Sequence, residues 1–378
     1  MRTMTLPFKI KDGILACGAD LKSKFCFTKG GRLYISDDFG DLSRIDNMEN
    51  YEKAMKEAIR VYKVRPKIIA CDIHPGYFST KFAQNYAANN PQCVLYKVQH
   101  HYAHIASCML DNGIKGKVIG VSFDGTGFGT DDNIWGSEIL LADLRGFKRM
   151  AHLDYIPMPG GESAVREPWR MAFSYLYKTY NHRLFNLGIP FMKKIGREKS
   201  SVLSKMIMNK INSPLTSSMG RLFDGVSSIL GVCDKITYEA EAAIELERIA
   251  DVNCEEKYAY KIQNGFEDSA IRIGEIIRGI VNDIKRNEKN SIISAKFHNT
   301  IAHFVKDAVS RIKKKEGTSK VVFSGGVFQN KYLVMRVKEF FSESEYKIYF
   351  HNVFPPTDVC IALGQIAVAG GQSEKGRR

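Results

Sequence analysis

Residues 93–127 read CVLYKVQHHYAHIASCMLDNGIKGKVIGVSFDGTG, and this stretch decides the fold class of the chain. It opens with a short apolar run at 93–98 and closes with another at 117–124, each typical of a buried strand. The segment between them, residues 100–112, has the length of a helix. Because strand and helix alternate at this pace, the stretch predicts an α/β lobe with a mixed sheet.

The same alternation continues on both sides of this stretch. Upstream, strands are expected within 13–37 and at 67–73, and helices at 47–63 and 79–90. Downstream, after further strands within 134–150, the chain is mostly helical, at 163–180, 200–212, 219–231, 237–250, 269–285 and 295–315. Strand and helix then alternate again, at 321–324, 327–341, 347–350 and 358–370. We therefore expect two lobes, residues 1–150 and 151–378, the second with a large helical insertion.

The composition agrees with a globular, intracellular protein. Of 378 residues, 44% are hydrophobic and 25% charged, which are globular averages. The eight cysteines form no C-x-x-C pair, so we expect reduced, buried structural thiols and neither a disulfide framework nor a zinc ribbon. The N-terminus lacks an apolar leader, and no uncharged apolar run is long enough to span a bilayer. These features predict a soluble, cytoplasmic protein without a membrane partner.

The net charge of +14 raises the question of a nucleic-acid partner. The basic residues are dispersed along the chain, and no stripe of alternating basic and aromatic residues is present. Charge alone speaks to solubility and loose attraction rather than to a specific site. We therefore favour a lysine-rich solvated surface over nucleic-acid binding.

Two histidines in the opening stretch suggest a metal site. His100 and His104 are four residues apart, so a helix projects both imidazoles from one face. Two neutral imidazoles at that spacing can share a divalent metal, with oxygen ligands completing the coordination. The alternative is a pair of ordinary surface or capping histidines. His101 must point elsewhere, and we expect it to contact a substrate.

Aspartates in two other motifs can supply the oxygen ligands. Asp124 ends a buried strand and is followed by Gly125, Thr126 and Gly127, a turn that suits a phosphate or a metal and also suits an ordinary hairpin. Asp358 begins a helix after two prolines, where a helix N-cap is the plainer explanation. A two-histidine site, however, needs such a carboxylate from the opposite lobe.

A third motif, VVFSGGVFQN at 321–330, suggests a nucleotide site. Gly325 and Gly326 lie between a strand and a helix, where backbone N–H groups can approach a phosphate. Asn330 can reach a base or sugar from the start of that helix. The motif has neither G-x-G-x-x-G nor G-x-x-x-x-G-K-[ST], which disfavours a Rossmann site and a P-loop.

Taken in order, the motifs resemble the C-terminal module of the HypF family of hydrogenase-maturation carbamoyltransferases. The resemblance extends from about Leu6 to Gln365 and rests on VQHHYAHIAS (98–107), FDGTGFG (123–129), IWGSE (134–138), PGGESAVREPWR (159–170), SSMGRLFD (217–224), YEAEAAIELE (238–247), FSGGVFQN (323–330) and PPTDVCIALGQ (355–365). The acylphosphatase, cysteine-rich and YrdC-like regions of that family have no counterpart here, in agreement with the missing C-x-x-C pairs.

The resemblance implies both a fold and a reaction. The fold is that of actin, Hsp70 and the sugar kinases, with two ribonuclease-H-like lobes and nucleotide between them. A YrdC-like domain makes carbamoyl-adenylate from carbamoyl phosphate and ATP. The module seen here then carries the carbamoyl group to the C-terminal cysteine of HypE, on the route to the cyanide ligands of [NiFe] hydrogenase. The implied partners are a HypE-like acceptor and a YrdC-like adenylating protein or domain.

The resemblance also implies roles for individual residues, matched motif by motif. The implied metal ligands are His100, His104, Asp124 and Asp358, a set that suits iron or zinc. The implied phosphate loops contain Gly125, Thr126, Gly127, Gly325 and Gly326, and the implied nucleoside contacts are Asp224, Glu245 and Asn330. Lys22 matches a phosphate loop in the first lobe, and Arg166 belongs to a motif of this branch. With His101, these two are the expected catalytic residues.

The chain departs from the family pattern at two places. Val359 and Cys360 replace a glycine pair, and Ala240 and Glu241 stand where the family commonly has Gly-Gln, so the added methyl of Ala240 can crowd a ribose. Three other functions therefore stay open: a tRNA threonylcarbamoyladenosine transferase of related fold, a small-molecule O-carbamoyltransferase, and a nucleotide-binding scaffold without turnover.

Overall fold

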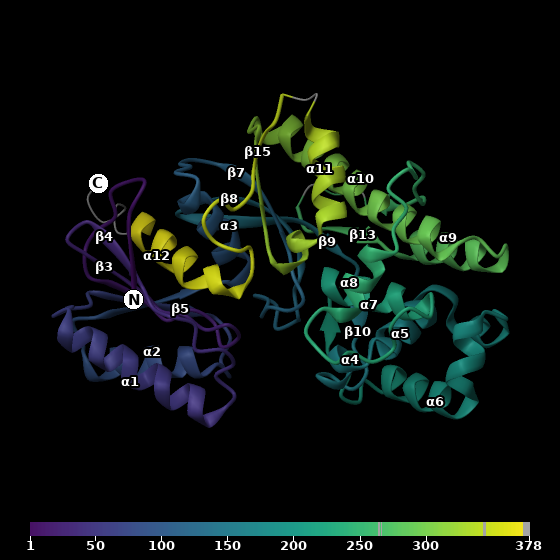
Figure 1. Ribbon diagram of the computed structural model, residues 1–378, viewed down its shortest axis with the longest axis horizontal. Helices are drawn as coiled ribbons and strands as arrows, with labels where there is room; N and C mark the ends of the chain where they lie inside the picture. The colour runs from purple at the N-terminus through teal and green to yellow at the C-terminus, as the bar shows by residue number, and fades with distance from the viewer. Residues whose placement is uncertain (264, 266, 343–344, 373–378) are drawn as a thin grey trace.

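The first sheet belongs to the N-terminal part of the chain. The computed structural model describes residues 1–263, 265, 267–342 and 345–372 (Figure 1). Six strands occur in the order β1-β4-β3-β2-β5-β6: β1 (Arg2–Thr5), β2 (Ile14–Ala16), β3 (Cys26–Lys29), β4 (Arg32–Ile35), β5 (Ile68–Asp72) and β6 (Val94–Val98). Strands β1 to β4 pair antiparallel, whereas β2, β5 and β6 are parallel. This is the mixed sheet that the sequence predicts.

Alternate residues of the first sheet face two different helix layers. Leu15 and Ile69 pack against α1 (Ile45–Val61) and α2 (Phe78–Asn89), whereas Ile14 and Ala70 pack against α3 (His100–Asp111) and α12 (Ile361–Gln372). In Figure 1 the sheet accordingly lies between the α1–α2 pair and α12. Because both faces are covered, the central strands are apolar at successive positions.

The second sheet is built from later parts of the chain. Seven strands occur in the order β12-β13-β9-β8-β7-β14-β15: β7 (Val118–Phe123), β8 (Ser137–Asp143), β9 (Gly146–Leu153), β12 (Lys261–Ile262), β13 (Ser269–Arg272), β14 (Lys320–Ser324) and β15 (Lys347–Tyr349). Strand β7 is antiparallel to β8 and parallel to β14. All six residues of β7 are buried, so this strand lies at the centre of the core.

Helices α3 and α12 form a layer shared by the two sheets. They pack closely on each other; α12 contacts β2 and β5 of the first sheet, and α3 contacts β7 and β14 of the second. The approach is so close that a Cβ on Gly364 would lie 1.9 Å from the carbonyl oxygen of Ala103. Only glycine fits there.

Some of the remaining helices cover the second sheet, and others form the insertion. These helices are α4 (Ser163–Arg166), α5 (Pro168–Tyr180), α6 (Pro190–Met208), α7 (Met219–Ile229), α8 (Glu241–Arg248), α9 (Gly274–Lys285), α10 (Asn290–Glu316) and α11 (Lys331–Ser342). In Figure 1 the insertion is seen at the lower right, around α4, α5, α6 and α7. A two-stranded sheet of β10 (Ile156–Pro157) and β11 (Leu215–Thr216) joins the insertion to the core. None of the helices in the described residues is long and apolar enough to cross a bilayer.

Four details differ from the sequence expectations. The boundary expected at residue 150 falls inside β9, and the change of sheet occurs earlier, between β6 and β7, because β7, β8 and β9 hydrogen-bond to one another. The helix expected at 163–180 is interrupted before Pro168, which begins a new helix. The segment expected as a helix at 269–285 starts with strand β13. The helices expected at 327–341 and 358–370 each begin with a 3-10 turn.

We expect Gly364→Ala to destabilise the protein by about 3 kcal/mol or more, because overpacking against a rigid backbone carbonyl forces α12 away from α3. Gly146→Ala is a matched control, since a Cβ at this exposed turn meets nothing within 4 Å. Denaturant unfolding of the three proteins measures the difference. Equal midpoints for both variants would contradict the close packing of the shared helix layer.

Candidate metal and nucleotide site

Helix α3 brings two histidines to the junction of the two sheets. Its N-terminus is capped by Gln99, whose Oε1 accepts a hydrogen bond of 2.9 Å from the backbone N–H of Tyr102. His100 and His104 follow one turn apart, both fully buried, with ring centroids separated by 5.0 Å. The expected common direction of the two imidazoles is therefore present.

Two aspartates from distant parts of the chain lie against these imidazoles. Asp124 directly follows β7, and its Oδ2 lies 2.9 Å from His104 Nε2 and 3.6 Å from His100 Nε2. Asp358 lies in the 3-10 turn before α12, and its Oδ1 lies 3.6 Å from both Nε2 atoms. One candidate ligand atom from each of the four side chains falls within a group no wider than 4.8 Å.

The spacing of these atoms suits a divalent metal. Ligand atoms about 2.0–2.2 Å from a common metal ion lie roughly 3–3.5 Å from each other. The observed separations of 2.9 and 3.6 Å lie within about 0.1 Å of the two ends of that range. Within the described part of the chain, the buried Nε2 of His100 has no hydrogen-bond partner, although carboxylate oxygens lie on two sides of it. A shared cation would satisfy that atom, so the residues fit a metal.

Further side chains contact the Nδ1 atoms of the two imidazoles, on the side away from the aspartate cluster. His100 Nδ1 lies 2.9 Å from Oδ2 of the fully buried Asp72, at the end of β5. His104 Nδ1 lies 3.4 Å from Ser324 Oγ and 3.5 Å from Cys360 Sγ. Contacts of this kind select which ring nitrogen faces a metal. Sequence reasoning missed Asp72, although a carboxylate at the end of a buried strand is itself a signal.

The electrostatics of the four groups are strongly coupled. Burial lowers the pKa of His100 and His104, but the facing carboxylates, together with Cys360 beside His104, outweigh it and raise both values well above the ordinary histidine pKa. Burial raises the pKa of Asp124 and Asp358, but the imidazoles outweigh it and lower both values. Without a metal, the site therefore holds protons on its imidazoles and negative charge on its carboxylates.

The glycine turns beside Asp124 orient this carboxylate. The N–H groups of Gly125 and Gly326 donate to Asp124 Oδ1 over 2.8 and 3.3 Å, which leaves Oδ2 to face the histidines. Gly325 has a φ of 98°, and a Cβ there would lie 2.2 Å from the carbonyl oxygen of Phe123. The N–H groups of Gly125 and Gly326 were expected to face a phosphate; in this structure they donate to the Asp124 carboxylate.

A cleft of about 350 Å³ opens beside the metal cluster and contains several of the predicted nucleotide contacts. Its lining includes Lys22, Gly125, Asp224, Gly326 and Asn330. Lys22 comes from the first lobe and forms an exposed ion pair of 2.9 Å with Glu239. The predicted residues Thr126, Gly127, Gly325 and Glu245 are not part of the lining.

The geometry of α8 explains why Glu245 is on the wrong face. Ala240, Ala243, Ile244 and Glu247 face the cleft at helical spacing, whereas Glu245 turns away and binds Arg248 over 2.8 Å. Ala240 precedes the helix in a left-handed conformation with a φ of 62°, where glycine is favoured. Ala240 is part of the cleft lining, and the crowding of a ribose by its methyl group stays a prediction.

Asn330 is engaged by the protein itself. Its Oδ1 accepts a bond of 2.7 Å from the N–H of Leu333 at the start of α11, and its Nδ2 lies 3.0 Å from Nε2 of the buried His298. The side chain therefore caps a helix at the edge of the cleft.

Two of the three expected catalytic residues lie outside the cleft. His101 is fully buried beneath Gly127, and a Cβ on that glycine would lie 2.4 Å from the imidazole. Burial lowers the pKa of His101 well below the ordinary value, so this ring is neutral. Arg166 is exposed and paired with Glu162. The substrate contact expected of His101 and the catalytic role expected of Arg166 find no support in this geometry.

Sequence reasoning also missed Arg221 and the surroundings of Cys360. Arg221 lines the cleft and forms an ion pair of 2.9 Å with Asp224. All eight cysteines are free thiols, and Cys360 is buried as expected. Burial raises its pKa, but His104 and His351 outweigh that effect and lower the pKa to about 6. Arg221 and Asp224 are three residues apart on α7, so helical spacing was a signal for that pair, whereas Cys360 and His104 are far apart in the sequence.

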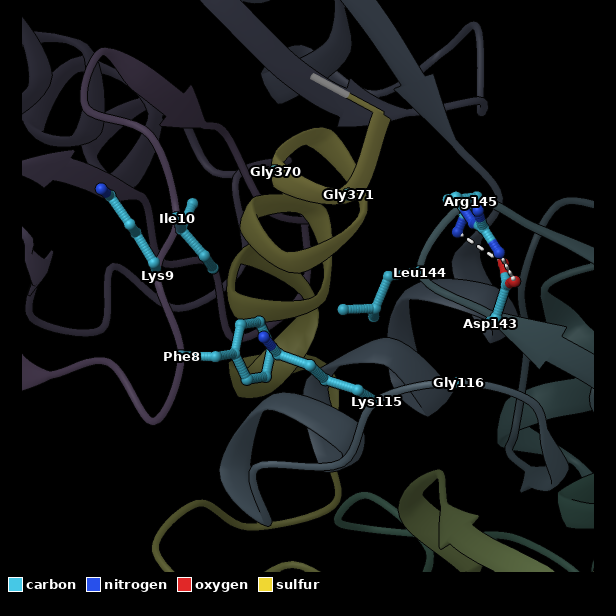
Figure 2. A pocket seen from close by; sticks show the side chains of 10 residues that line it. All are labelled: Phe8, Lys9, Ile10, Lys115, Gly116, Asp143, Leu144, Arg145, Gly370 and Gly371. Carbon is cyan, nitrogen blue, oxygen red and sulfur yellow. Dashed lines mark hydrogen bonds and ion pairs between the residues drawn. The ribbon is translucent and has the colours of Figure 1, made fainter. Parts of the chain in front are cut away.

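A second cavity, of about 330 Å³, lies away from this site, at the end of α12 (Figure 2). Lys115 lies over the ring of Phe8, with Nζ 5.1 Å from the centroid, and Arg145 pairs with Asp143 over 3.2 Å. The basic side chains that line this cavity are exposed. The cavity shares no residue with the metal cluster or the cleft.

The comparisons with known proteins match this geometry along the whole chain. Residues 9–111 match the family model described as the HypF Kae1-like domain, and residues 120–365 match the carbamoyltransferase Kae1-like domain, second subdomain. The first match ends with α3 and the second begins inside β7, so the gap between them lies close to the point where the chain changes sheet.

Named relatives support the same family. The chain is 32% identical to carbamoyltransferase HypF of Synechocystis sp. over 96% of this chain and 48% of that protein. It is 31% identical to a carbamoyltransferase HypF homolog of Cupriavidus necator over 98% of this chain and 95% of that protein. The chain thus spans about half the length of the first of these relatives and nearly all of the second.

Solved structures confirm the fold. A full-length HypF in phosphate- and nucleotide-bound form has a TM-score of 0.90 and 38% identity, covering 98% of this chain and 57% of that one. The HypF of T. kodakarensis has a TM-score of 0.84 and 30% identity, covering 99% of this chain and 49% of that one. The expected two-lobed α/β fold of the actin/Hsp70/sugar-kinase type is confirmed.

We expect the affinity for a divalent metal to fall as the pH falls. Because the pKa values of His100 and His104 are raised, a metal must displace protons from both imidazoles, and its apparent affinity drops by up to about tenfold per pH unit for each proton displaced. Zinc titration against a competing chelator across the neutral range measures the slope. His104→Ala should bind zinc more weakly and with a shallower slope, whereas the exposed His182→Ala serves as a control. Binding that does not respond to pH would contradict the ligand set.

Proposed function

The chain belongs to the HypF carbamoyltransferase family, and from that membership we propose that it transfers a carbamoyl group from carbamoyl-adenylate to the C-terminal cysteine of a HypE-like acceptor. The observation that carries the proposal is the four-residue cluster of His100, His104, Asp124 and Asp358 beside a cleft between the lobes. We further propose that this transfer serves the synthesis of the cyanide ligands of [NiFe] hydrogenase.

The cleft has the dimensions and chemistry to hold a nucleotide. Its volume of about 350 Å³ is in the range of small-molecule sites, and the lining includes Ala243 and Ile244 as apolar side chains for a base. Asp224 and Asn330 offer polar groups in the same lining. A related HypF structure is in a phosphate- and nucleotide-bound form, which supports the same use of this cleft.

The reaction itself is an acyl-type transfer from oxygen to sulfur. The carbon–oxygen bond between the carbamoyl group and the phosphate breaks, a carbon–sulfur bond forms, AMP leaves, and the thiol proton passes to solvent. A metal held by His100, His104, Asp124 and Asp358, either iron or zinc, would neutralise phosphate charge and polarise the reacting carbonyl. Asp72 orients His100, and Gly125 and Gly326 orient Asp124, so the protein keeps these ligands in place.

The proposed partners follow from the same reaction. A YrdC-like protein or domain supplies carbamoyl-adenylate, since the motifs of this chain include none for making it. The acceptor presents a cysteine at a chain end, which can enter a narrow cleft more easily than a folded surface can. The Cupriavidus necator HypF homolog is matched over 95% of its own length, so a relative of this family can consist of little more than the region described here.

The test mixes the protein with carbamoyl-adenylate and a HypE-like acceptor and weighs the acceptor for one added carbamoyl group. We expect His104→Ala to reduce transfer by about 100-fold or more, because several kcal/mol of charge stabilisation depend on the metal. His182→Ala should keep full activity, and circular dichroism should show both variants folded.

Three outcomes would each assign the protein differently. Full activity of His104→Ala would remove the cluster from the reaction. Nucleotide binding without AMP release would identify a scaffold without turnover. Modification of tRNA in place of the acceptor, supplied with threonylcarbamoyl-adenylate, would identify the related tRNA-modifying activity.

A further inference from the structure

We propose that Arg221 is the phosphate-binding side chain of the cleft and makes it select a nucleoside monophosphate group over an uncharged nucleoside. This inference deepens the proposed function and rests on it for the presence of a nucleotide in the cleft. Arg221 lies in the first turn of α7, and its guanidinium is part of the cleft lining.

The first observation is that the guanidinium is buried with unused hydrogen-bond donors. The side chain is 10% exposed, and within the described residues its Nε and Nη1 donate no hydrogen bond. Nη1 lies 2.9 Å from Asp224 Oδ2, an ion-pair distance, but the angles are not those of a hydrogen bond. A buried charged donor without a hydrogen bond is unfavourable by itself. Both nitrogens are enclosed by the protein, so a phosphate would reach them only if the side chain turned toward the cleft; the planar guanidinium fork is suited to that ligand.

The second observation is that the neighbouring backbone donors are already in use. In the first turn of α7, the N–H of Met219 donates to Gly136 O, that of Gly220 to Asp124 O, and that of Arg221 to Ser218 Oγ, each over 3.1 Å. In the glycine turns, the N–H groups of Gly125 and Gly326 donate to the Asp124 carboxylate. These five amides are therefore already engaged, whereas the Arg221 side chain is a charged donor in the cleft lining with unused hydrogen-bonding capacity.

The third observation is the charge of the lining. Its acidic side chains are Asp124, Asp224, Glu239 and Glu247, and its basic side chains are Lys22 and Arg221. Acids outnumber bases, so an anionic ligand is repelled unless a cation faces it directly. Lys22 lies at the exposed rim and is engaged with Glu239. Arg221 is the basic group placed inside.

The fourth observation is where the guanidinium lies. A Cβ on Gly125 would be 3.4 Å from Arg221 Nη2, and a Cβ on Gly220 would be 2.9 Å from the Cα of Gly125. The first turn of α7 is thus pressed against the residue that follows Asp124. A phosphate held by Arg221 would lie beside the carboxylate end of the metal cluster, where the bond to the carbamoyl group must be broken.

The alternative explanation is that the ion pair of Arg221 and Asp224 only stabilises α7. Asp224 is 3% exposed; burial raises its pKa, and Arg221 offsets this only in part. The pair therefore leaves both groups incompletely satisfied, unlike a bidentate pair made for stability.

The experiment compares the affinities of AMP and adenosine for the full chain by calorimetry. We expect the wild type to prefer AMP, and Arg221→Gln to lose about 10- to 100-fold of that preference, because hydrogen bonds to a charged group contribute about 1.5–3 kcal/mol. Adenosine affinity should be unchanged. Arg248→Gln removes the same charge from an exposed ion pair outside the cleft and should leave both affinities unchanged.

Arg221→Lys covers the case in which the glutamine variant fails to fold. Lysine keeps the charge opposite Asp224 but lacks the planar fork, so we expect a partial loss of AMP preference with the fold retained. An unchanged AMP-to-adenosine ratio in the folded variants, an equal loss for both ligands, or no AMP binding by the wild type would overturn the proposal.

The result can be separated from that of the transfer assay. AMP preference that depends on Arg221, without carbamoylation of the acceptor, would leave this inference standing and remove the proposed function. If the protein carbamoylates the acceptor but its AMP preference is the same with and without Arg221, the proposed function stands and the inference about Arg221 is wrong.

Discussion

The structure depends on burying two imidazoles and two carboxylates together where its two sheets meet. Separately, each of these groups would be unfavourable in the core. Together they compensate one another, and the atom that stays unsatisfied, His100 Nε2, points to the centre of the group. The ligands come from α3, the end of β7 and the turn before α12, so the cluster requires the relative placement of all three elements.

Much of the surrounding architecture serves to hold those side chains. Asp72 ends β5 and fixes His100, while the glycine turns after β7 and β14 fix Asp124. Glycine is required in these turns for close backbone approach as well as for its conformation. These turns were expected to bind phosphate, and in this structure the N–H groups of Gly125 and Gly326 donate to the Asp124 carboxylate.

The sequence predicts the fold well and names the four residues that the structure gathers into one cluster, but it predicts the cleft lining less well. His100 and His104 are found because helical spacing is a local rule, and Asp358 because its motif resembles that of a known family. Glu245 was expected in the cleft in place of Glu247, because the face of a short helix depends on its first residue, which Ala240 sets in a left-handed conformation. Asp224, the ion-pair partner of Arg221, is only three residues away, but the approach of Arg221 to Gly125 and of Cys360 to His104 joins segments far apart in the sequence.

The shared layer of α3 and α12 has a consequence for how the molecule unfolds. One continuous apolar core joins Ile14 and Ala70 of the first sheet to Val118 and Val322 of the second through these helices. A boundary between independently stable domains has few contacts across it, and here the densest packing lies at the boundary. The two lobes are therefore halves of one cooperative unit, and neither would persist as a native fragment without the other.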